Sequence, residues 1–199
     1  MGQHVLKVIL VMSGKGGVGK STVAVNLARA MAQSGSATGL LDADLHGPSL
    51  SKLTGSELSQ VYSENGKLFP VRAEENLWVL STAHFLKDPD SPVIWRGPMK
   101  HGFLKQMSEE VDWSMTEVLV IDCPPGTGDE LLSLTQVFHP AGAVVVSTPQ
   151  NMALLDARKA IQFCIQTQVP VLGLIENMGT YVCPECGKES PLFEGNGIE

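Results

Sequence analysis

No apolar run in this sequence is long enough to span a membrane as a helix. Residues 5–12 are apolar, but the run is short, contains Lys7 and is followed by no small-residue cleavage site, so we expect a strand and not a signal peptide. Basic residues are also scarce. Lys and Arg total 14 against 21 Asp and Glu, and the net charge of −7 argues against sequence-independent binding to nucleic acid. We therefore expect neither a membrane nor a nucleic acid as a partner.

Cysteine is rare as well, and the spacing of the four cysteines does not resemble the disulfide framework of a small secreted protein. This scarcity favours the cytoplasm as the compartment. Cys164 lies in a run with helical apolar spacing and Cys123 directly follows an apolar run, so both are predicted to pack in the interior. Cys183 and Cys186 differ, because they form the pair C-P-E-C followed by glycine.

The composition is that of a folded chain: 199 residues, 43% hydrophobic and 18% charged, predict one domain with a buried core. Apolar runs alternate with stretches of helical spacing, which indicates a doubly wound α/β fold with a mainly parallel sheet and helices on both faces. The polar, turn-rich residues 55–76 predict a surface excursion with room for a small hairpin. The expected strands are residues 5–12, 38–44, 77–81, 118–122, 143–147 and 171–177, and the expected helices are residues 23–31, 99–111, 130–137 and 154–166.

Residues 14–22 read G-K-G-G-V-G-K-S-T between a predicted strand and a predicted helix. In this context the Walker A pattern G-x-x-x-x-G-K-[ST] marks a phosphate-binding P-loop. Its glycines let backbone N–H groups curl around phosphate oxygens, and the helix dipole adds to the attraction. Lys20 is expected to reach the β- and γ-phosphates, and the Ser21 hydroxyl to bind Mg²⁺. The sequence has no N-K-x-D motif for guanine, which favours ATP over GTP.

Three carboxylates are expected near this loop, because ligand groups collect at the carboxyl ends of parallel strands. Asp42 and Asp44 end one predicted strand, where a carboxylate can orient water for attack on the γ-phosphate or hold a water on Mg²⁺. Asp122 ends an apolar run in the Walker B pattern and should act on Mg²⁺. It is followed by C-P-P-G-T-G-D, in which Gly126 lets the backbone approach and leave a γ-phosphate, as a switch loop does.

The pair Cys183 and Cys186 has the spacing with which two thiolates bind one metal centre from a single turn. Three interpretations stay open on the residues alone: a structural zinc site, an iron–sulfur site and a redox disulfide. Both metal sites need four ligands, and the sequence contains no second C-x-x-C and no C-x-x-H. The ligand count therefore indicates a metal shared by two chains.

Lys15 follows the first glycine of the loop, at a position where an ordinary P-loop needs no basic residue. The loop thus resembles the deviant Walker A motif of the family that includes nitrogenase iron protein, MinD, ParA and the Mrp/ApbC iron–sulfur carriers. Further segments resemble the Mrp/ApbC branch: D-A-D-L-H-G-P-S from Asp42, I-W-R-G-P from Ile94, D-C-P-P-G-T-G-D from Asp122, and E-N-M-G with the cysteine pair. MinD and ParA share only the nucleotide motifs, and the resemblance covers most of the chain.

This resemblance implies a homodimeric ATPase that carries a [4Fe–4S] cluster to apo iron–sulfur proteins. In the family the additional lysine crosses the dimer interface to the partner's nucleotide, the residue matching Asp44 positions the attacking water, and the segment containing Asn177 contacts adenine. The implied catalytic residues are Lys15, Lys20 and Asp44; the implied nucleotide-binding residues are Gly14, Lys15, Gly16, Gly17, Val18, Gly19, Lys20, Ser21, Thr22, Asp42, Asp122, Gly126 and Asn177; and the implied metal ligands are Ser21 and Asp122 for Mg²⁺ and Cys183 and Cys186 for the cluster.

Two other functions stay open: a MinD- or ParA-type ATPase switch in spatial regulation, and a P-loop ATPase stabilised by zinc. Members of the family continue with another strand and helix past the position that matches Glu199. We therefore expect residues 1–199 to form one P-loop NTPase domain that lacks this strand and helix, with residues 178–190 as a metal-binding loop. His46 is interpreted as a turn residue and not as a ligand.

Overall fold

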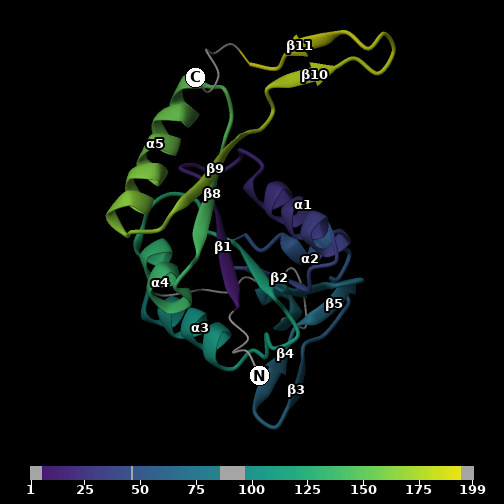
Figure 1. Ribbon diagram of the computed structural model, residues 1–199, viewed down its shortest axis with the longest axis vertical. Coiled ribbons are helices and arrows are strands. Elements are labelled where there is room, and N and C mark those ends of the chain that lie inside the picture. Colours follow the sequence, from purple (N-terminus) through teal and green to yellow (C-terminus); the bar gives the residue numbers. More distant parts are fainter. Residues whose placement is uncertain (1–5, 46, 86–96, 194–199) are drawn as a thin grey trace.

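The computed structural model describes residues 6–45, 47–85 and 97–193, which form a seven-stranded sheet with helices on both sides (Figure 1). The strand order is β5-β6-β2-β7-β1-β8-β9, and every neighbouring pair is parallel except the antiparallel pair of β5 and β6 at one edge. This confirms the predicted doubly wound α/β fold. The strands of the sheet are β1 (Lys7–Met12), β2 (Thr38–Asp42), β5 (Val71–Glu74), β6 (Leu77–Leu80), β7 (Val118–Asp122), β8 (Gly142–Ser147) and β9 (Val171–Glu176).

The central strands are buried on both faces, which explains their continuous apolar sequences. Leu10 and Val11 of β1 are inaccessible to solvent, as are Leu119, Val120 and Ile121 of β7. Because successive side chains of a strand point to opposite faces, Leu10, Leu119 and Ile121 join one hydrophobic cluster, whereas Val11 and Val120 join another. The sheet therefore needs a layer of helices on each face.

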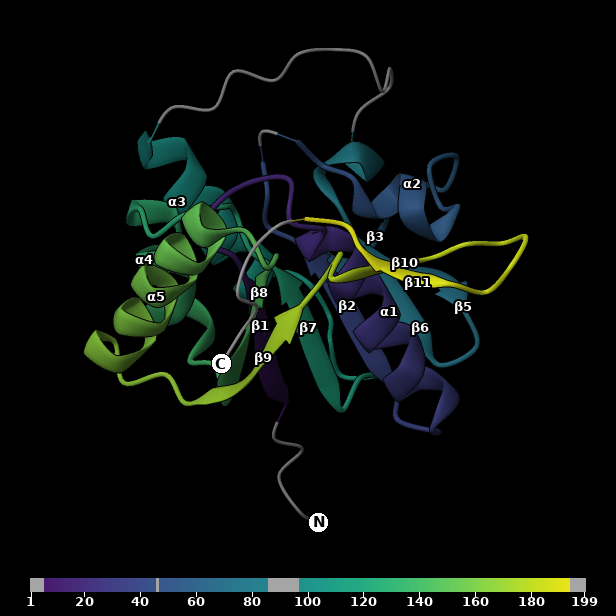
Figure 2. The same cartoon turned by 90° about the horizontal axis from the view of Figure 1, so that it is seen from above.

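The helices supply these two layers, as the view from above shows (Figure 2). One face is covered by α1 (Lys20–Gln33) and α2 (Leu50–Thr54), and the other by α3 (Gly97–Glu109), α4 (Asp129–Phe138) and α5 (Asn151–Gln166). Small residues face the sheet, such as Ala24 and Ala28 of α1 and Ala157 of α5. Cys164 of α5 and Cys123 are both inaccessible, which confirms that they pack in the interior. Within the described ranges no helix is long and apolar enough to cross a membrane.

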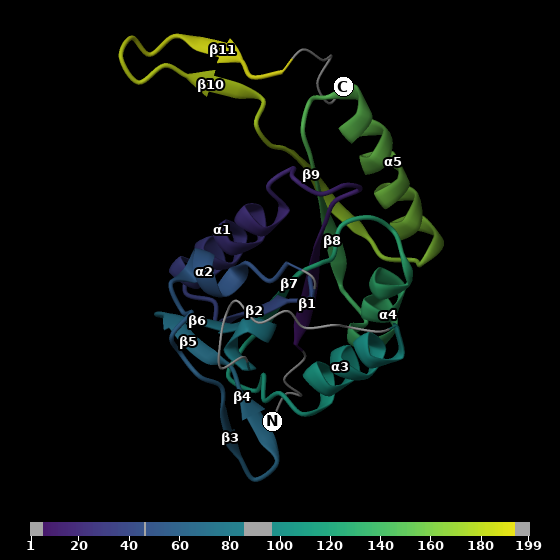
Figure 3. The same ribbon diagram turned by 180° about the vertical axis from the view of Figure 1, so that it is seen from behind.

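Two small hairpins lie outside the main sheet, at opposite ends of the molecule (Figure 3). They consist of β3 (Tyr62–Glu64) with β4 (Lys67–Phe69), and of β10 (Thr180–Val182) with β11 (Glu189–Pro191). The first confirms the hairpin expected in residues 55–76. The prediction missed β5, which joins the main sheet antiparallel to β6. Asn76, with φ of 57°, turns the chain between the two strands, and the alternating sequence V-R-A-E was the signal for this edge strand.

Some predicted boundaries are wrong. Helix α1 begins at Lys20, three positions before the predicted start, because the P-loop runs directly into its first turn. Strand β2 ends at Asp42, so Asp44 lies in the loop beyond it. A 3-10 helix, η1 (Thr82–Phe85), follows β6. The interpretations of His46 and of residues 94–96 in the I-W-R-G-P segment concern positions outside the described residues.

Gly39 in β2 allows a large side chain to lie against the strand. A Cβ atom at this position would lie 2.8 Å from Cζ3 of Trp113 and 3.0 Å from Cδ1 of Leu119, which are both buried. We expect Gly39→Ala to lower the free energy of unfolding by about 1–3 kcal/mol in urea titrations, because overpacking forces core side chains to shift. Gly102→Ala in α3 is the matched control, since no atom lies within 4 Å of its added Cβ and alanine favours a helix. Equal stability of the two variants would contradict this packing.

Candidate functional site

The P-loop joins the end of β1 to the start of α1 at the centre of the sheet. Gly17 and Gly19 have φ of 81° and 85°, a backbone conformation that glycine adopts without strain. Gly14 is required by packing, because a Cβ atom there would lie 2.1 Å from the backbone of Asp156 in α5. The loop borders a hollow of about 220 Å³, lined by Gly16, Gly17, Gly19, Lys20, Ser21, Thr22, Asp44 and Pro125. Val18 of the loop is buried.

Lys20 forms a buried ion pair with Asp122, in which Nζ of Lys20 lies 2.5 Å from Oδ1 of Asp122. Burial raises the pKa of Asp122, and the charge of Lys20 opposes this shift. The other oxygen, Oδ2, is buried and has no hydrogen-bond partner among the described residues. Buried carboxylate oxygens normally have partners, so an unpartnered one beside a phosphate-sized hollow fits a divalent cation, for which Ser21 on the hollow wall offers a hydroxyl.

Asp42 and Asp44 have different positions, although the sequence suggested one site for both. Asp42 is 1% exposed and turns into the protein, where its Oδ2 accepts hydrogen bonds from the backbone N–H groups of Ser49 and Leu50 and from the hydroxyl of Ser81. Asp42 therefore caps α2. The side chain of Ser49, the residue before this helix, makes no capping hydrogen bond.

The pKa of Asp42 is raised to about 7, chiefly by burial and next by the charge of Asp122, against hydrogen bonds from Leu50 and Ser49. Between the ordinary value of 3.8 and about 7 the folded chain therefore binds more protons than the unfolded chain, so this group's contribution to stability falls as pH rises. Asp42→Asn does not titrate. In urea titrations across this pH window, the free energy of unfolding of the variant should rise relative to that of the parent. Above about pH 7 the difference between the two should stay constant. A difference in free energy of unfolding that is the same at every pH would contradict the raised pKa of Asp42.

Lys15, Asp44 and Gly126 are three more of the residues predicted to act at the phosphate site. Nζ of Lys15 donates to Oε1 of Gln150 at 3.3 Å, and the lysine is half-buried. Asp44 lines the hollow. The N–H of Gly126 donates to the carbonyl of Ser13 at 2.9 Å, which fixes the loop after β7 against the base of the P-loop. Asp129 is the first residue of α4, and no side-chain cap bond is made at this helix start.

Asn177 follows the end of β9 and contacts the P-loop. Its side-chain Nδ2 donates to the carbonyl of Val18 at 2.9 Å, and its backbone N–H donates to the carbonyl of Ser147 at 2.8 Å. The sequence identified Asn177 as a candidate, but nothing in it indicated this bond.

The cysteine pair lies in the turn of the β10–β11 hairpin, which extends away from the sheet (Figures 1 and 3). Cys183 is half-buried and Cys186 is exposed. The N–H of Gly187, whose φ is 70°, donates to the carbonyl of Cys183 and closes the turn. Hydrogen bonds from the backbone N–H groups of Cys186 and then Glu185 lower the pKa of Cys183, which favours the metal-binding thiolate. Across the described ranges no three His, Cys, Asp or Glu side chains gather closely enough to hold a metal ion.

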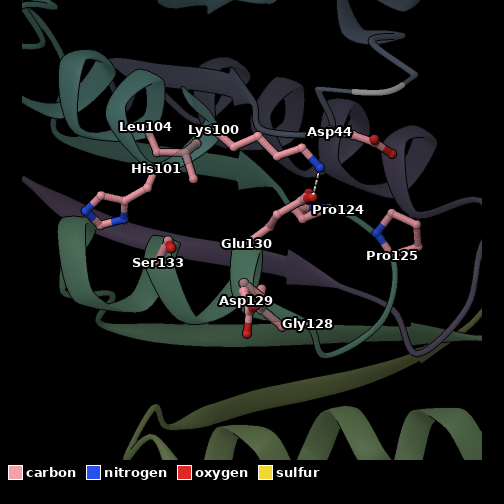
Figure 4. A pocket seen from close by; sticks show the side chains of 11 residues that line it. Asp44, Lys100, His101, Leu104, Pro124, Pro125, Gly128, Asp129, Glu130 and Ser133 are labelled. Carbon is pink, nitrogen blue, oxygen red and sulfur yellow. Dashed lines mark hydrogen bonds and ion pairs between the residues drawn. The ribbon is translucent and has the colours of Figure 1, made fainter. Parts of the chain in front are cut away.

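A larger cleft adjoins the phosphate hollow between α3 and α4, and sequence reasoning did not find it (Figure 4). Its volume is about 440 Å³, and Asp44 and Pro125 line both cavities. Lys100 of α3 and Glu130 of α4 form an ion pair along this cleft. Neither residue belongs to a motif, so no local signal pointed to the pair. The cleft is lined by Asp44, Lys100, His101, Leu104, Pro124, Pro125, Gly128, Asp129, Glu130, Leu131 and Ser133.

These features together match a known family. Its model, described as a ParA-type NUBPL iron-transfer P-loop NTPase, matches residues 4–199. The chain belongs to this family. The predicted kinship with deviant Walker A proteins that serve iron–sulfur assembly is thereby confirmed.

Individual relatives agree. The chain is 47% identical over 190 residues to the cytosolic Fe–S cluster assembly factor NUBP1 homologue of Caenorhabditis elegans, covering 93% of this chain and 61% of that protein. It is 45% identical over 194 residues to the NUBP2 homologue of Dictyostelium discoideum, covering 95% of this chain and 73% of that protein. The chain thus spans less than two thirds of the NUBP1 homologue.

Solved structures show the same architecture. The nucleotide-binding protein of Archaeoglobus fulgidus in complex with ADP superposes with a TM-score of 0.84 at 39% identity, over 97% of this chain and 75% of that one. The cell-division ATPase MinD of Pyrococcus furiosus reaches a TM-score of 0.60 at 22% identity, over 87% of this chain and 73% of that one. The second likeness establishes the fold alone.

Proposed function

We propose that this chain is an ATP-hydrolysing carrier of iron–sulfur clusters, which holds a [4Fe–4S] cluster between two copies of itself and transfers it to apoproteins. One observation carries the proposal: a P-loop hollow and a paired-thiol hairpin occur together in a member of the iron-transfer P-loop NTPase family. The names of the relatives, cytosolic Fe–S cluster assembly factors, support this activity and a cytosolic location.

The hollow is the proposed ATP site. Backbone N–H groups of residues 16–19 would hold the phosphates, Lys20 would supply charge to them, and Asp44 would orient the attacking water. Mg²⁺ fits the donor set because Ser21 offers a hydroxyl and Asp122 an unpartnered buried oxygen. When bound, Mg²⁺ neutralises charge that develops on the phosphate oxygens.

Asn177 supports adenine over guanine. Because its Nδ2 donates to Val18, its Oδ1 remains available as an acceptor. The exocyclic amino group of adenine is a donor, whereas guanine presents a carbonyl oxygen at the equivalent position. A base that approaches Asn177 would therefore find a match in adenine.

The hairpin is the proposed cluster site, with residues 178–190 as its metal-binding loop. A [4Fe–4S] cubane normally takes four thiolates, and one chain offers Cys183 and Cys186, since Cys123 and Cys164 are sealed in the core. Two copies related by a two-fold axis supply four thiolates through one symmetric interface. The proposed contact of Lys15 with the nucleotide of the partner chain also requires a symmetric dimer.

A structural zinc site is the second candidate, favoured by the backbone N–H groups that Cys186 and Glu185 direct at the sulfur of Cys183. A MinD- or ParA-type switch without metal is the third, and the fold similarity to MinD is what supports it.

Anaerobic reconstitution with ferrous iron and sulfide tests these functions. The proposal expects a brown protein with about two irons per chain, one cubane per dimer. Light scattering should report the dimer, phosphate release should report hydrolysis of ATP, and an apo iron–sulfur acceptor should gain the cluster. Bound zinc with no uptake of iron would favour the structural site. A chain that hydrolyses ATP but takes up neither metal would favour the switch.

A further inference from the structure

The root of the cysteine hairpin contacts the P-loop through the side chain of Asn177. Asn177 connects the end of β9 to the hairpin, and its Nδ2 donates to the carbonyl of Val18 at 2.9 Å. The contact is close on the glycine side as well, because a Cβ atom on Gly19 would lie 2.2 Å from the same nitrogen. Glycine at this position therefore lets the Asn177 amide lie directly on the P-loop backbone.

The hairpin beyond this root has little other support. Every residue of β10 is exposed, and in β11 only Ser190 is half-buried. Met178, next to Asn177, has φ of 59°, a left-handed conformation that a residue other than glycine keeps only when its surroundings hold it. At the base of the hairpin the N–H of Leu192 donates to the carbonyl of Gly179. The direction in which the hairpin leaves the fold is thus set over residues 177–179.

The accepting carbonyl belongs to a peptide unit that faces the phosphate hollow. The carbonyl of Val18 and the N–H of Gly19 are parts of one planar group, so neither can turn without the other. Gly19 lines the hollow, where P-loop N–H groups bind phosphate oxygens. A phosphate that reorients the N–H of Gly19 therefore also moves the carbonyl that Asn177 contacts.

We infer that Asn177 is a positioning residue that transmits the orientation of the Val18–Gly19 peptide to the cysteine hairpin. Through Met178 and Gly179, the position of its amide sets how β10 and the cysteine turn are presented. Occupancy of the ATP site and presentation of the thiols are then coupled within one chain, without a contact across a dimer. The inference rests on the proposed ATP site, but it needs no bound cluster.

Amide hydrogen exchange on the full chain, with and without a non-hydrolysable ATP analogue and Mg²⁺, tests this coupling. In the parent, saturating nucleotide should change exchange in peptides from residues 178–192 by about fivefold or more, the lower end of usual coupling between sites. The β3–β4 hairpin at the opposite end of the molecule is the internal reference and should not respond (Figure 3).

Asn177→Ala and the isosteric Asn177→Asp, which cannot donate to Val18, should both lose this response. Each variant is measured at a nucleotide concentration that saturates it, so that altered affinity does not enter, and circular dichroism checks that it is folded. Asn26→Ala is the matched control, because Asn26 also donates to a backbone carbonyl at 2.9 Å, but within α1, and it should respond as the parent does.

The outcomes separate this inference from the proposed function. A response that survives in Asn177→Asp would overturn the inference. So would a parent that binds nucleotide, shown with a fluorescent analogue, while its hairpin stays unchanged; the ATP site would then stand. A parent that binds no ATP would overturn the proposed function and the inference with it.

Discussion

Lys20→Ala should reduce ATP hydrolysis by about 10²–10³-fold, the usual cost of removing a group that stabilises charge in a transition state. Lys20 is the lysine that lines the phosphate hollow, and its Nζ lies 2.5 Å from Asp122, a proposed Mg²⁺ ligand. Its removal leaves both the phosphates and this carboxylate without their cation. Phosphate release under saturating ATP and Mg²⁺ measures the effect.

Control measurements distinguish a loss of catalysis from a loss of the folded state. Lys20→Ala also leaves Asp122 buried and unpaired, which costs about 3–5 kcal/mol for a typical buried pair, so urea titration must show that the variant is folded at the assay temperature. Lys159→Ala removes a lysine that is 70% exposed and should keep the parental rate.

Lys15→Ala should lose hydrolysis with little change in stability, because Lys15 is half-buried and bonds only weakly to Gln150 at 3.3 Å. A Lys15 variant with the parental rate would refute its proposed role across the dimer.

The double variant Cys183→Ser/Cys186→Ser should lose all reconstituted iron and still bind ATP. Two serines give poor ligands for iron in place of two thiolates, while the P-loop, the carboxylates and Asn177 are unchanged. Iron and sulfide assays after anaerobic reconstitution measure the first effect, and a fluorescent ATP analogue the second.

Cys123→Ser/Cys164→Ser is unsuitable as a control, because both thiols are buried and serine would destabilise the core. Ser190→Ala, in β11 of the same hairpin, is the better reference, and it should retain the iron. Iron that persists in the double cysteine variant would mean that the cluster lies elsewhere. Loss of ATP binding together with the metal would indicate a structural metal, as zinc is.

The fold was predictable because its signals are local. Strands β1 and β7 are continuous apolar runs, which only a sheet covered on both faces can bury. The P-loop was predictable for the same reason, since loop, lysine and helix start are adjacent in sequence. Edge strand β5 was missed because a short amphipathic run in a polar region gives a weak signal.

The contacts within the site were less predictable where the contacting residues are distant in sequence. Both aspartates of D-A-D follow one apolar run, and only the folded chain shows that Asp42 caps α2 while Asp44 lines the hollow. The contacts of Asn177 with Val18 and of Lys100 with Glu130 likewise join separate elements of the fold. The sequence of neither element indicates its partner. Such contacts follow from topology and packing, which no motif encodes.

The position of β1 has a consequence for how the chain folds during its synthesis. Its neighbours in the sheet are β7 and β8, so that Lys7 pairs with Val118 and Met12 with Val145. Pairings between residues so far apart in sequence form slowly, because a long loop must close before they contribute any stability. The P-loop, which follows β1, is therefore made well before β7 and β8, the strands that must pair with β1 before the loop can reach its final form. Until β7 has emerged, the apolar strand β1 has no neighbour in the sheet, and a chaperone that shields β1 could act while the segment between β1 and β7 is translated.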